Sequence, residues 1–321
     1  MRNNEIRTLK RLCSLLHLKE EYILDLASRA NSCYYSYDKK SRKKDGTAKI
    51  RHIDSPNIEL KNIQKKIDSV IIKPYVNLLP DYIHGARTGK SIVTNATNHA
   101  GYEAILSLDI ENCFPSITSK RIYYIFRNTI HCSDKVASVL TTLTTKDGVL
   151  PQGCPTSASL CNLVLVQMIE KLSEIDGSLD YNISHYIDDI FYSGRYCDLQ
   201  KIRKPAMTEI GKNGFRPNTK KTLLVKNGRP MKVTGITVNT KVSAGRRRIR
   251  KIQRKILKIT EKDKAEYDIV LKNRKRNNNS KIKACKIEKL FGEISNVISI
   301  NKEQGYKLKK KIEAKLNDLI T

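Results

Sequence analysis

The chain has 321 residues and carries 61 lysine and arginine residues against 32 acidic ones, which gives a formal net charge of +29. Such an excess repels itself in a compact fold, so it favours a polyanionic partner, and nucleic acid fits better than a membrane surface. The sequence has no apolar run near the ~18 residues of a membrane span and no signal-peptide core, so we expect a cytoplasmic protein. Its eight cysteines lack zinc-site spacing, which favours reduced thiols.

The first part of the chain predicts helices on either side of a charged hairpin. Apolar residues recur at helical spacing over 5–30, which indicates one or two amphipathic helices. The basic stretch 38–46 and the run 49–53 predict a hairpin with a charged tip. A further helix is expected to begin after Asn57 and to extend to Pro74.

The central block, 104–225, contains short apolar runs and amphipathic segments, which predict both strands and helices. Strands are expected to end at Asp109 and to flank the pair Asp188-Asp189. The helices predicted in this block cover 119–127, 135–142, 158–172 and 201–211. The block also contains a glycine- and proline-rich loop at 150–157.

The last part of the chain becomes helical and strongly basic. Asn227-Gly228 separates two β-rich runs, 222–225 and 231–238, and predicts a hairpin. From Lys241 onward there are 25 basic and 9 acidic residues. Segment 246–259 places four isoleucines on one helical face and arginine or lysine on most other positions. We interpret this helix as one that follows a phosphate backbone, although a solvated surface is the simpler alternative.

Three carboxylates are predicted at the edge where strands end. Asp109 belongs to one strand, and Asp188 and Asp189 form a pair beside another. If the fold brings them together, they repel one another unless a divalent cation neutralises them. Carboxylate oxygens select Mg²⁺ or Mn²⁺, and such a site suits phosphoryl transfer through two metal ions. The alternative for a bare Asp-Asp pair is a solvated turn, but here an apolar run, Ile190-Phe191, follows it.

The order of these motifs resembles that of reverse transcriptases. The resemblance rests on Asp109 to Phe114, Pro151-Gln-Gly-Cys-Pro-Thr-Ser157, Tyr186-Ile-Asp-Asp189, Gly214-Phe with Asn218 and Lys221, and Val233-Thr-Gly235. Asn95-Ala-Thr-Asn-His99 and Val233-Thr-Gly235 are similar to elements of the bacterial retron enzymes in particular. The family fold is a right hand of α+β class with fingers, an antiparallel palm sheet and a helical thumb. On this chain it implies an N-terminal helical extension (1–34), fingers (35–100), palm (101–240) and thumb (241–321).

The resemblance also implies catalytic roles. Asp109, Asp188 and Asp189 would hold two Mg²⁺ ions, with Mn²⁺ tolerated, and Lys221 would protonate or steady the leaving pyrophosphate. Phe114 would crowd the 2′-position of the incoming nucleotide and exclude ribonucleotides.

Nucleotide and RNA contacts follow in the same way. Gln152 and Gly153 would contact nucleotide and template, while Arg51 and Lys44 would bind the triphosphate, with Lys43 an alternative to Lys44. For Asn95 and His99 we leave two roles open, RNA contact and the shaping of a loop. The remaining residues implied in RNA or DNA binding are Val233, Thr234, Gly235, Arg246, Arg247, Arg250, Lys251 and Arg254.

The expected activity is that of a retron reverse transcriptase, which copies part of a cognate structured noncoding RNA into single-stranded DNA that stays joined to that RNA. Its partners would be this RNA, the RNA–DNA product, dNTPs and a separate effector protein of an antiphage system. The alternatives are another bacterial reverse transcriptase, of the group II intron or diversity-generating type, or a non-catalytic RNA-binding relative. The three aspartates disfavour the last of these.

Overall fold

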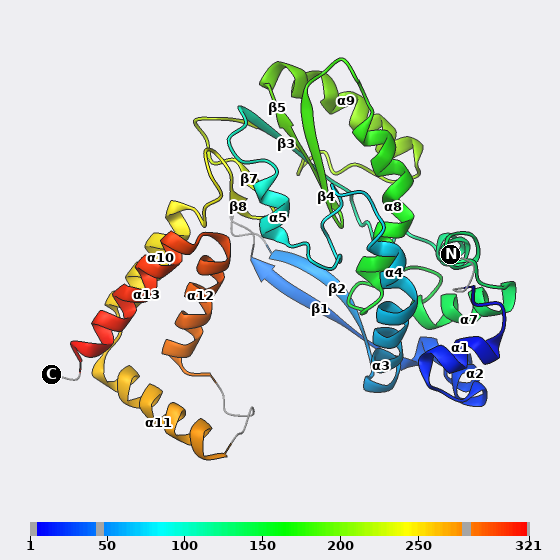
Figure 1. The fold of residues 1–321 in the computed structure, drawn as a ribbon, viewed down its shortest axis with the longest axis horizontal. Coiled ribbons are helices and arrows are strands. Elements are labelled where there is room, and N and C mark those ends of the chain that lie inside the picture. The colour runs from blue at the N-terminus through cyan, green and yellow to red at the C-terminus, as the bar shows by residue number, and fades with distance from the viewer. Residues whose placement is uncertain (1–4, 43–47, 278–283, 320–321) are drawn as a thin grey trace. The chain divides into compact units, whose positions relative to one another are not determined.

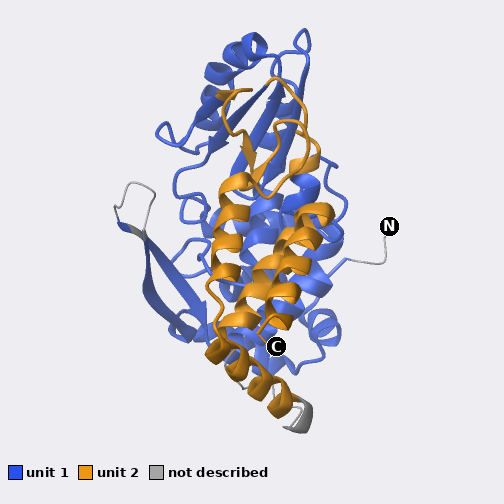
Figure 2. Ribbon diagram, turned by 90° about the vertical axis from the view of Figure 1, so that its left-hand side faces the viewer, with its two compact units in different colours: residues 1–95, 104–224 blue, residues 96–103, 225–321 orange. Residues whose placement is uncertain are grey.

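The computed structural model describes residues 5–42, 48–277 and 284–319, which form an α+β fold (Figure 1). The chain is divided into two compact units, and the second takes up a short segment, 96–103, from within the first (Figure 2). The first unit contains 1–95 and 104–224, and the second contains 96–103 and 225–321. Within the described ranges no helix is long and apolar enough to cross a membrane.

The N-terminal helices form where the apolar spacing predicts them. Helix α1 (Leu9–Leu16) begins after Thr8, whose hydroxyl accepts a hydrogen bond from the Arg11 backbone N–H at 3.1 Å. It ends at His17, which has a left-handed φ of 52°. Helix α2 (Glu20–Ser28) follows, and both helices bury leucine and isoleucine side chains in the core of the first unit.

The predicted hairpin is confirmed and is longer than expected. Strands β1 (Tyr34–Arg42) and β2 (Ala48–Pro56) pair antiparallel, with Lys39 opposite Arg51. Asn57 caps α3 (Ile58–Lys66) by accepting a hydrogen bond from the Leu60 N–H at 2.9 Å. The chain then stays helical through a π-helical segment, Ile67–Ile72, and α4 (Lys73–Val76), so Pro74 does not end it.

A four-stranded sheet forms the centre of the first unit, in the order β4-β5-β3-β6. Its strands are β3 (Ala104–Asp109), β4 (Tyr181–Tyr186), β5 (Asp189–Gly194) and β6 (Leu223–Lys226). Strand β5 pairs antiparallel with both β3 and β4. Helix α9 packs against β3 and β5, and α8 packs against α9. The helices of this region are α5 (Ile92–Thr97), α6 (Ser119–Tyr124), α7 (Asp134–Thr144), α8 (Ser157–Ser173) and α9 (Tyr196–Lys212), with a π-helical segment, Ile125–Thr129, after α6.

The turn between β4 and β5 lies against a glycine. Ile187 adopts a φ of 62°, an unfavourable conformation for a β-branched residue. A Cβ at Gly85 would lie 2.5 Å from Ile187 Cγ1 and 2.8 Å from the Ile187 backbone nitrogen. Asn162 holds Gly85 in place, because its side-chain amide donates to the Gly85 carbonyl at 2.5 Å. The turn can therefore occupy this position only because residue 85 has no side chain.

In its described residues, the second unit contains a small hairpin followed by four helices. Strands β7 (Lys232–Val233) and β8 (Ile236–Thr237) pair across a two-residue turn, in which Thr234 and Gly235 both have positive φ. The hairpin predicted around Asn227-Gly228 is wrong, because β6 belongs to the large sheet while β7 pairs with β8. The helices are α10 (Arg246–Leu257), α11 (Glu261–Asn277), α12 (Lys286–Ile300) and α13 (Lys302–Asn317).

The contact between Gly85 and Ile187 leads to a stability prediction. Gly85→Ala should lower the free energy of unfolding by roughly 1–3 kcal/mol, because the new methyl group forces the β4–β5 turn to shift. The matched control is Gly177→Ala, where an added Cβ meets no atom within 4 Å. Denaturant unfolding of the two variants tests this, and equal stabilities would show that the turn adapts without cost.

Candidate active site

The sheet places the three predicted carboxylates at one end of neighbouring strands. Asp109 and Asp189 are direct partners in the antiparallel register of β3 and β5. Asp188 lies in the turn just before β5, and its carbonyl accepts a hydrogen bond from the Ile110 N–H at 3.2 Å. Asp109 and Asp188, which are 79 positions apart in sequence, are thus brought to a single edge of the sheet, as the sequence predicts.

Burial and charge repulsion both act on these acids. Asp109 is only 7% exposed. Burial raises the pKa of Asp188 above its ordinary value, and the neighbouring Asp109 charge raises it further. The cations of Lys221 and Arg51 oppose that rise, so both lie close enough to act on the carboxylate. The site therefore combines crowded carboxylates with two positive side chains that come from different parts of the chain.

Lys221 supplies the charge that neutralises Asp109. Its ammonium nitrogen lies 2.6 and 2.7 Å from the two Asp109 carboxylate oxygens. The loop that carries Lys221 is attached to the end of β3, because the Asn218 N–H donates to the Asp109 carbonyl at 2.8 Å. The Lys221 N–H in turn donates to the Asn218 carbonyl at 3.1 Å. The lysine that the sequence motif predicts is therefore a direct neighbour of the acids.

The donor set matches a divalent cation in its chemistry. Three carboxylates at one edge supply the hard oxygen ligands that Mg²⁺ prefers, and their mutual repulsion is what a cation relieves. Among the described residues, no three His, Cys, Asp or Glu side chains already surround a common point. In this structure the Lys221 ammonium contacts Asp109 instead. Asp109, Asp188 and Asp189 are the residues that would hold the metal.

The loop at 151–157 lies against strand β2. The Asp54 N–H donates to the Gln152 carbonyl at 2.9 Å. Gly153 has a φ of 129°, and a Cβ there would lie 2.9 Å from the Asp54 carbonyl oxygen. The close approach that this glycine permits is thus an approach to strand β2, a reason that the sequence alone did not reveal. Ser157 closes the loop by donating its hydroxyl to the Pro151 carbonyl at 2.7 Å.

The other residues predicted to bind the nucleotide lie in different environments. Phe114 follows β3 and is half-buried, packed against the hydrophobic core. Arg51 is exposed on β2, and its charge acts on Asp188. Lys44 and its alternative Lys43 lie outside the described residues.

The Asn95 and His99 side chains are completely buried. Neither polar atom of the Asn95 side chain has a hydrogen-bond partner among the described residues. Burial favours the loop-shaping alternative for both residues over contact with RNA. Val233 is likewise buried, whereas Thr234 and Gly235 form the β7–β8 turn.

Helix α10 has the two faces that its sequence predicts. Ile252 and Ile256 are buried, as is Ile259 just after the helix, while Ile249 is half-buried. The basic residues predicted to contact nucleic acid are all exposed, and none forms an ion pair with an acid of the described residues. They are Arg246, Arg247, Arg250, Lys251 and Arg254.

A buried polar layer next to the β4–β5 turn was not found from the sequence. His84 and His185 lie side by side through a backbone hydrogen bond, from the His84 N–H to the His185 carbonyl, of 2.8 Å. Burial lowers the pKa of each imidazole to about 4, so both are neutral at pH 7. His-Gly at 84–85 is the only sequence signal for this contact, and it gives no indication of the distant strand it touches.

Comparisons with known proteins identify the family to which this chain belongs. Residues 39–238 match the family described as reverse transcriptase (RNA-dependent DNA polymerase). The chain is 30% identical over 224 residues to the retron Ec86 reverse transcriptase of Escherichia coli, covering 69% of this chain and 68% of that enzyme. It is 30% identical over 218 residues to the retron Mx65 reverse transcriptase of Myxococcus xanthus, covering 61% of this chain and 50% of that enzyme. The chain therefore spans about half the length of the Mx65 relative.

Two solved structures are similar at much lower identity. Apo telomerase from Candida tropicalis is 12% identical, with a TM-score of 0.45 over 64% of this chain and 47% of that chain. Telomerase from Candida albicans, in complex with a TWJ fragment of telomeric RNA, is 11% identical, with a TM-score of 0.46 over 94% of this chain and 59% of that chain.

The matched span contains β3, the β4–β5 turn with its aspartate pair, and the loop at 151–157. By this match the chain belongs to the reverse transcriptase family, the RNA-dependent DNA polymerases, and it is related to the retron enzymes of that family.

Proposed function

We propose that this protein is a retron reverse transcriptase that copies part of a cognate noncoding RNA into single-stranded DNA linked to that RNA. The observation that carries the proposal is the register that sets Asp109 opposite Asp189, with Asp188 beside them and Lys221 and Arg51 within electrostatic reach. The fingers, palm and thumb in this proposal keep the bounds 35–100, 101–240 and 241–321.

Each side chain then has a task in nucleotidyl transfer. Asp109, Asp188 and Asp189 would hold two Mg²⁺ ions, which would supply Lewis-acid activation of the primer hydroxyl and charge stabilisation for the leaving pyrophosphate. Arg51 binds the triphosphate, for which a planar guanidinium is well suited. Lys221 moves from Asp109 to the pyrophosphate and supplies positive charge or a proton there.

Nucleic-acid binding in this proposal rests on α10. Its exposed arginines and lysine lack acidic partners among the described residues, so they are available to phosphates. The relatives that carry retron names support a cognate structured RNA as the partner, together with dNTPs. An antiphage role with a separate effector protein is part of the same proposal.

The metal-binding assignment predicts separate effects on catalysis and on RNA binding. Asp188→Asn or Asp189→Asn should lower the rate of RNA-templated DNA synthesis by roughly 10³-fold or more, because a metal ligand is removed. RNA affinity should stay within about twofold, since phosphate contacts elsewhere provide it. Primer extension and RNA binding are measured side by side, with Asp180→Asn, just before β4, as the control. A mutant that extends primers at the wild-type rate in Mg²⁺ would refute the assignment.

Phe114 carries the prediction on sugar selectivity. Phe114→Ala should raise the use of ribonucleotides relative to deoxynucleotides by roughly 10- to 100-fold, because steric exclusion at the 2′-position is removed. Deoxynucleotide use should change much less. Competition between dNTP and NTP in primer extension measures the ratio. If a folded variant keeps the wild-type ratio, Phe114 is only a core residue.

The α10 surface predicts a change in salt dependence. Neutralising Arg246, Arg247, Arg250 and Lys251 to Gln should weaken RNA binding and flatten the log–log salt slope, by roughly 0.7–0.9 for each phosphate that the helix no longer neutralises. Thermal stability should change little, because all four side chains are exposed. The control removes four exposed charges from the first unit, at Lys10, Arg11, Lys19 and Lys65. Equal slopes for the two quadruple variants would make α10 a solvated surface.

A further inference from the structure

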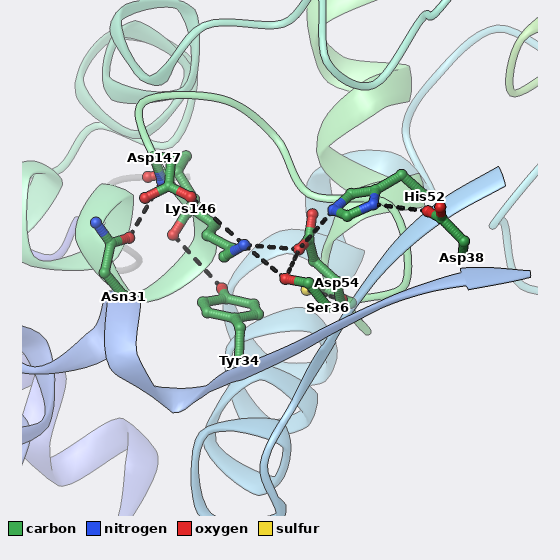
Figure 3. Close-up of polar contacts among 10 residues, drawn as sticks. Asn31, Tyr34, Ser36, Asp38, His52, Asp54, Lys146 and Asp147 are labelled. Atoms are coloured by element: carbon green, nitrogen blue, oxygen red, sulfur yellow. Dashed lines mark hydrogen bonds and ion pairs between the residues drawn. The ribbon is translucent and has the colours of Figure 1, made fainter.

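A charged cluster connects the fingers hairpin to the segment that leads into the 151–157 loop (Figure 3). The Lys146 ammonium lies 2.7 Å from an Asp54 carboxylate oxygen and 2.9 Å from the Ser36 hydroxyl. Ser36 also donates to Asp54 at 2.6 Å. His52 lies at the edge of the cluster, 3.6 Å from Asp54 and 3.1 Å from Asp38. Asp54 is thus the residue on which the cluster converges.

Asp54 is held a second time, through its backbone. Its N–H donates to the Gln152 carbonyl, and its own carbonyl accepts from the Cys154 thiol at 3.7 Å. Gly153 lies so close that a Cβ there would approach the same carbonyl to 2.9 Å. One residue of β2 is therefore held through its side chain by Lys146 and through its backbone by the loop that begins five residues later.

Lys146 is itself held in a rigid turn. Lys146 and Val149 exchange backbone hydrogen bonds of 2.9 and 3.0 Å, and the two residues between them, Asp147 and Gly148, have φ of 48° and 78°. These are the features of a type I′ turn. The Asp147 N–H donates to the Asn31 side chain at 3.2 Å, which ties the turn to the short 3₁₀ segment Ala30–Cys33 that precedes β1 (Figure 3). The ammonium therefore extends from a fixed base.

The ion pair between Lys146 and Asp54 is largely buried, and both partners are charged. The Lys146 and Asp54 side chains are 17% and 15% exposed. Burial alone would raise the pKa of Asp54, but the hydrogen bonds from Lys146 and Ser36 outweigh it and hold the pKa below its ordinary value. The hydrogen bond to Asp54 raises the pKa of Lys146. Removal of either partner leaves the other with an uncompensated charge.

Strand β2 transmits this attachment to Arg51. Arg51 and Asp54 are three residues apart on one strand, so they point to opposite faces of the hairpin. The Asp54 face contacts Lys146, while Arg51 is exposed on the opposite face. Because β2 pairs with β1 at both residues, a shift at Asp54 moves Arg51 as well.

We propose that Lys146 and Asp54 are positioning residues, which lock β2 to the 146–154 segment and so hold Arg51 and Gln152 at a fixed distance from each other over the nucleotide site. This inference rests on the proposed function, because it assigns Arg51 and Gln152 to the incoming dNTP. Neither Lys146 nor Asp54 touches substrate in it; both act through the residues they hold.

The test measures nucleotide KM and kcat separately in steady-state primer extension. Asp54→Asn and Lys146→Met should each raise the KM for dNTP by roughly tenfold while kcat falls by less than about twofold, because ground-state positioning is weakened and the chemistry is kept. The double variant should be no worse than either single one, since both remove the same interaction. Lys146→Arg should restore most of the affinity. The control is Asp25→Asn, which removes an ion pair of 2.9 Å with Arg29 in α2.

Amide hydrogen exchange tests the lock without any reference to catalysis. In Lys146→Met the N–H of Asp54 should exchange faster than in the wild type, because its bond to Gln152 is no longer held in register. One outcome separates the two proposals: the Asp54 N–H exchanges faster in Lys146→Met, but the wild-type protein does not synthesise DNA on an RNA template. That outcome would support the lock and refute the proposed function. If the folded variants keep both the wild-type KM and the wild-type exchange rate, the lock is refuted. A parallel decline of kcat, dNTP affinity and melting temperature would reduce the pair to a structural ion pair.

Discussion

The fold has to keep negative charges close together at one edge of a sheet. Antiparallel pairing of β3 with β5 places Asp109 opposite Asp189, and the turn before β5 adds Asp188. Carboxylates in a partly buried environment repel strongly, because water no longer screens them. The structure offsets this cost with cations from distant segments, Lys221 after α9 and Arg51 in β2. The position of each of these segments is therefore tied to the acids.

Several separate hydrogen bonds hold the segments around the acids in place. The Lys221 loop is attached to the end of β3 through Asn218, and the loop at 151–157 is attached to β2 through Asp54. Behind the turn, a buried histidine pair and the Asn162–Gly85 hydrogen bond form a layer without charge. The hydrogen bonds that this layer makes to backbone carbonyls hold the backbone without adding charge to a site that already has an excess of it.

Much of the local structure could be predicted from the sequence, because the signals for it are local. The end of β3 at Asp109, the strands on either side of the turn before Asp189, the cap at Asn57 and the isoleucine face of α10 each follow from residues within a few positions. Long-range pairings could not be predicted. Asn227-Gly228 has the sequence of a hairpin turn, yet the Asn227 N–H bonds to the Glu103 carbonyl at 2.8 Å. The Lys146–Asp54 pair spans 92 residues, and neither partner has a neighbour in sequence that indicates the other.

The left-handed conformation of Ile187 has a consequence for how this site can change over evolutionary time. Glycine or asparagine would relieve the backbone at this position at no steric cost, whereas isoleucine costs roughly 1–3 kcal/mol there. The Ile187 side chain packs against the core of the first unit, next to the aspartates in sequence. Burial of this apolar side chain offsets the cost of the left-handed backbone conformation. A stabilising substitution at 187 would remove this apolar anchor and loosen the turn. The residue that suits the backbone at 187 is therefore different from the residue that anchors the turn in the core.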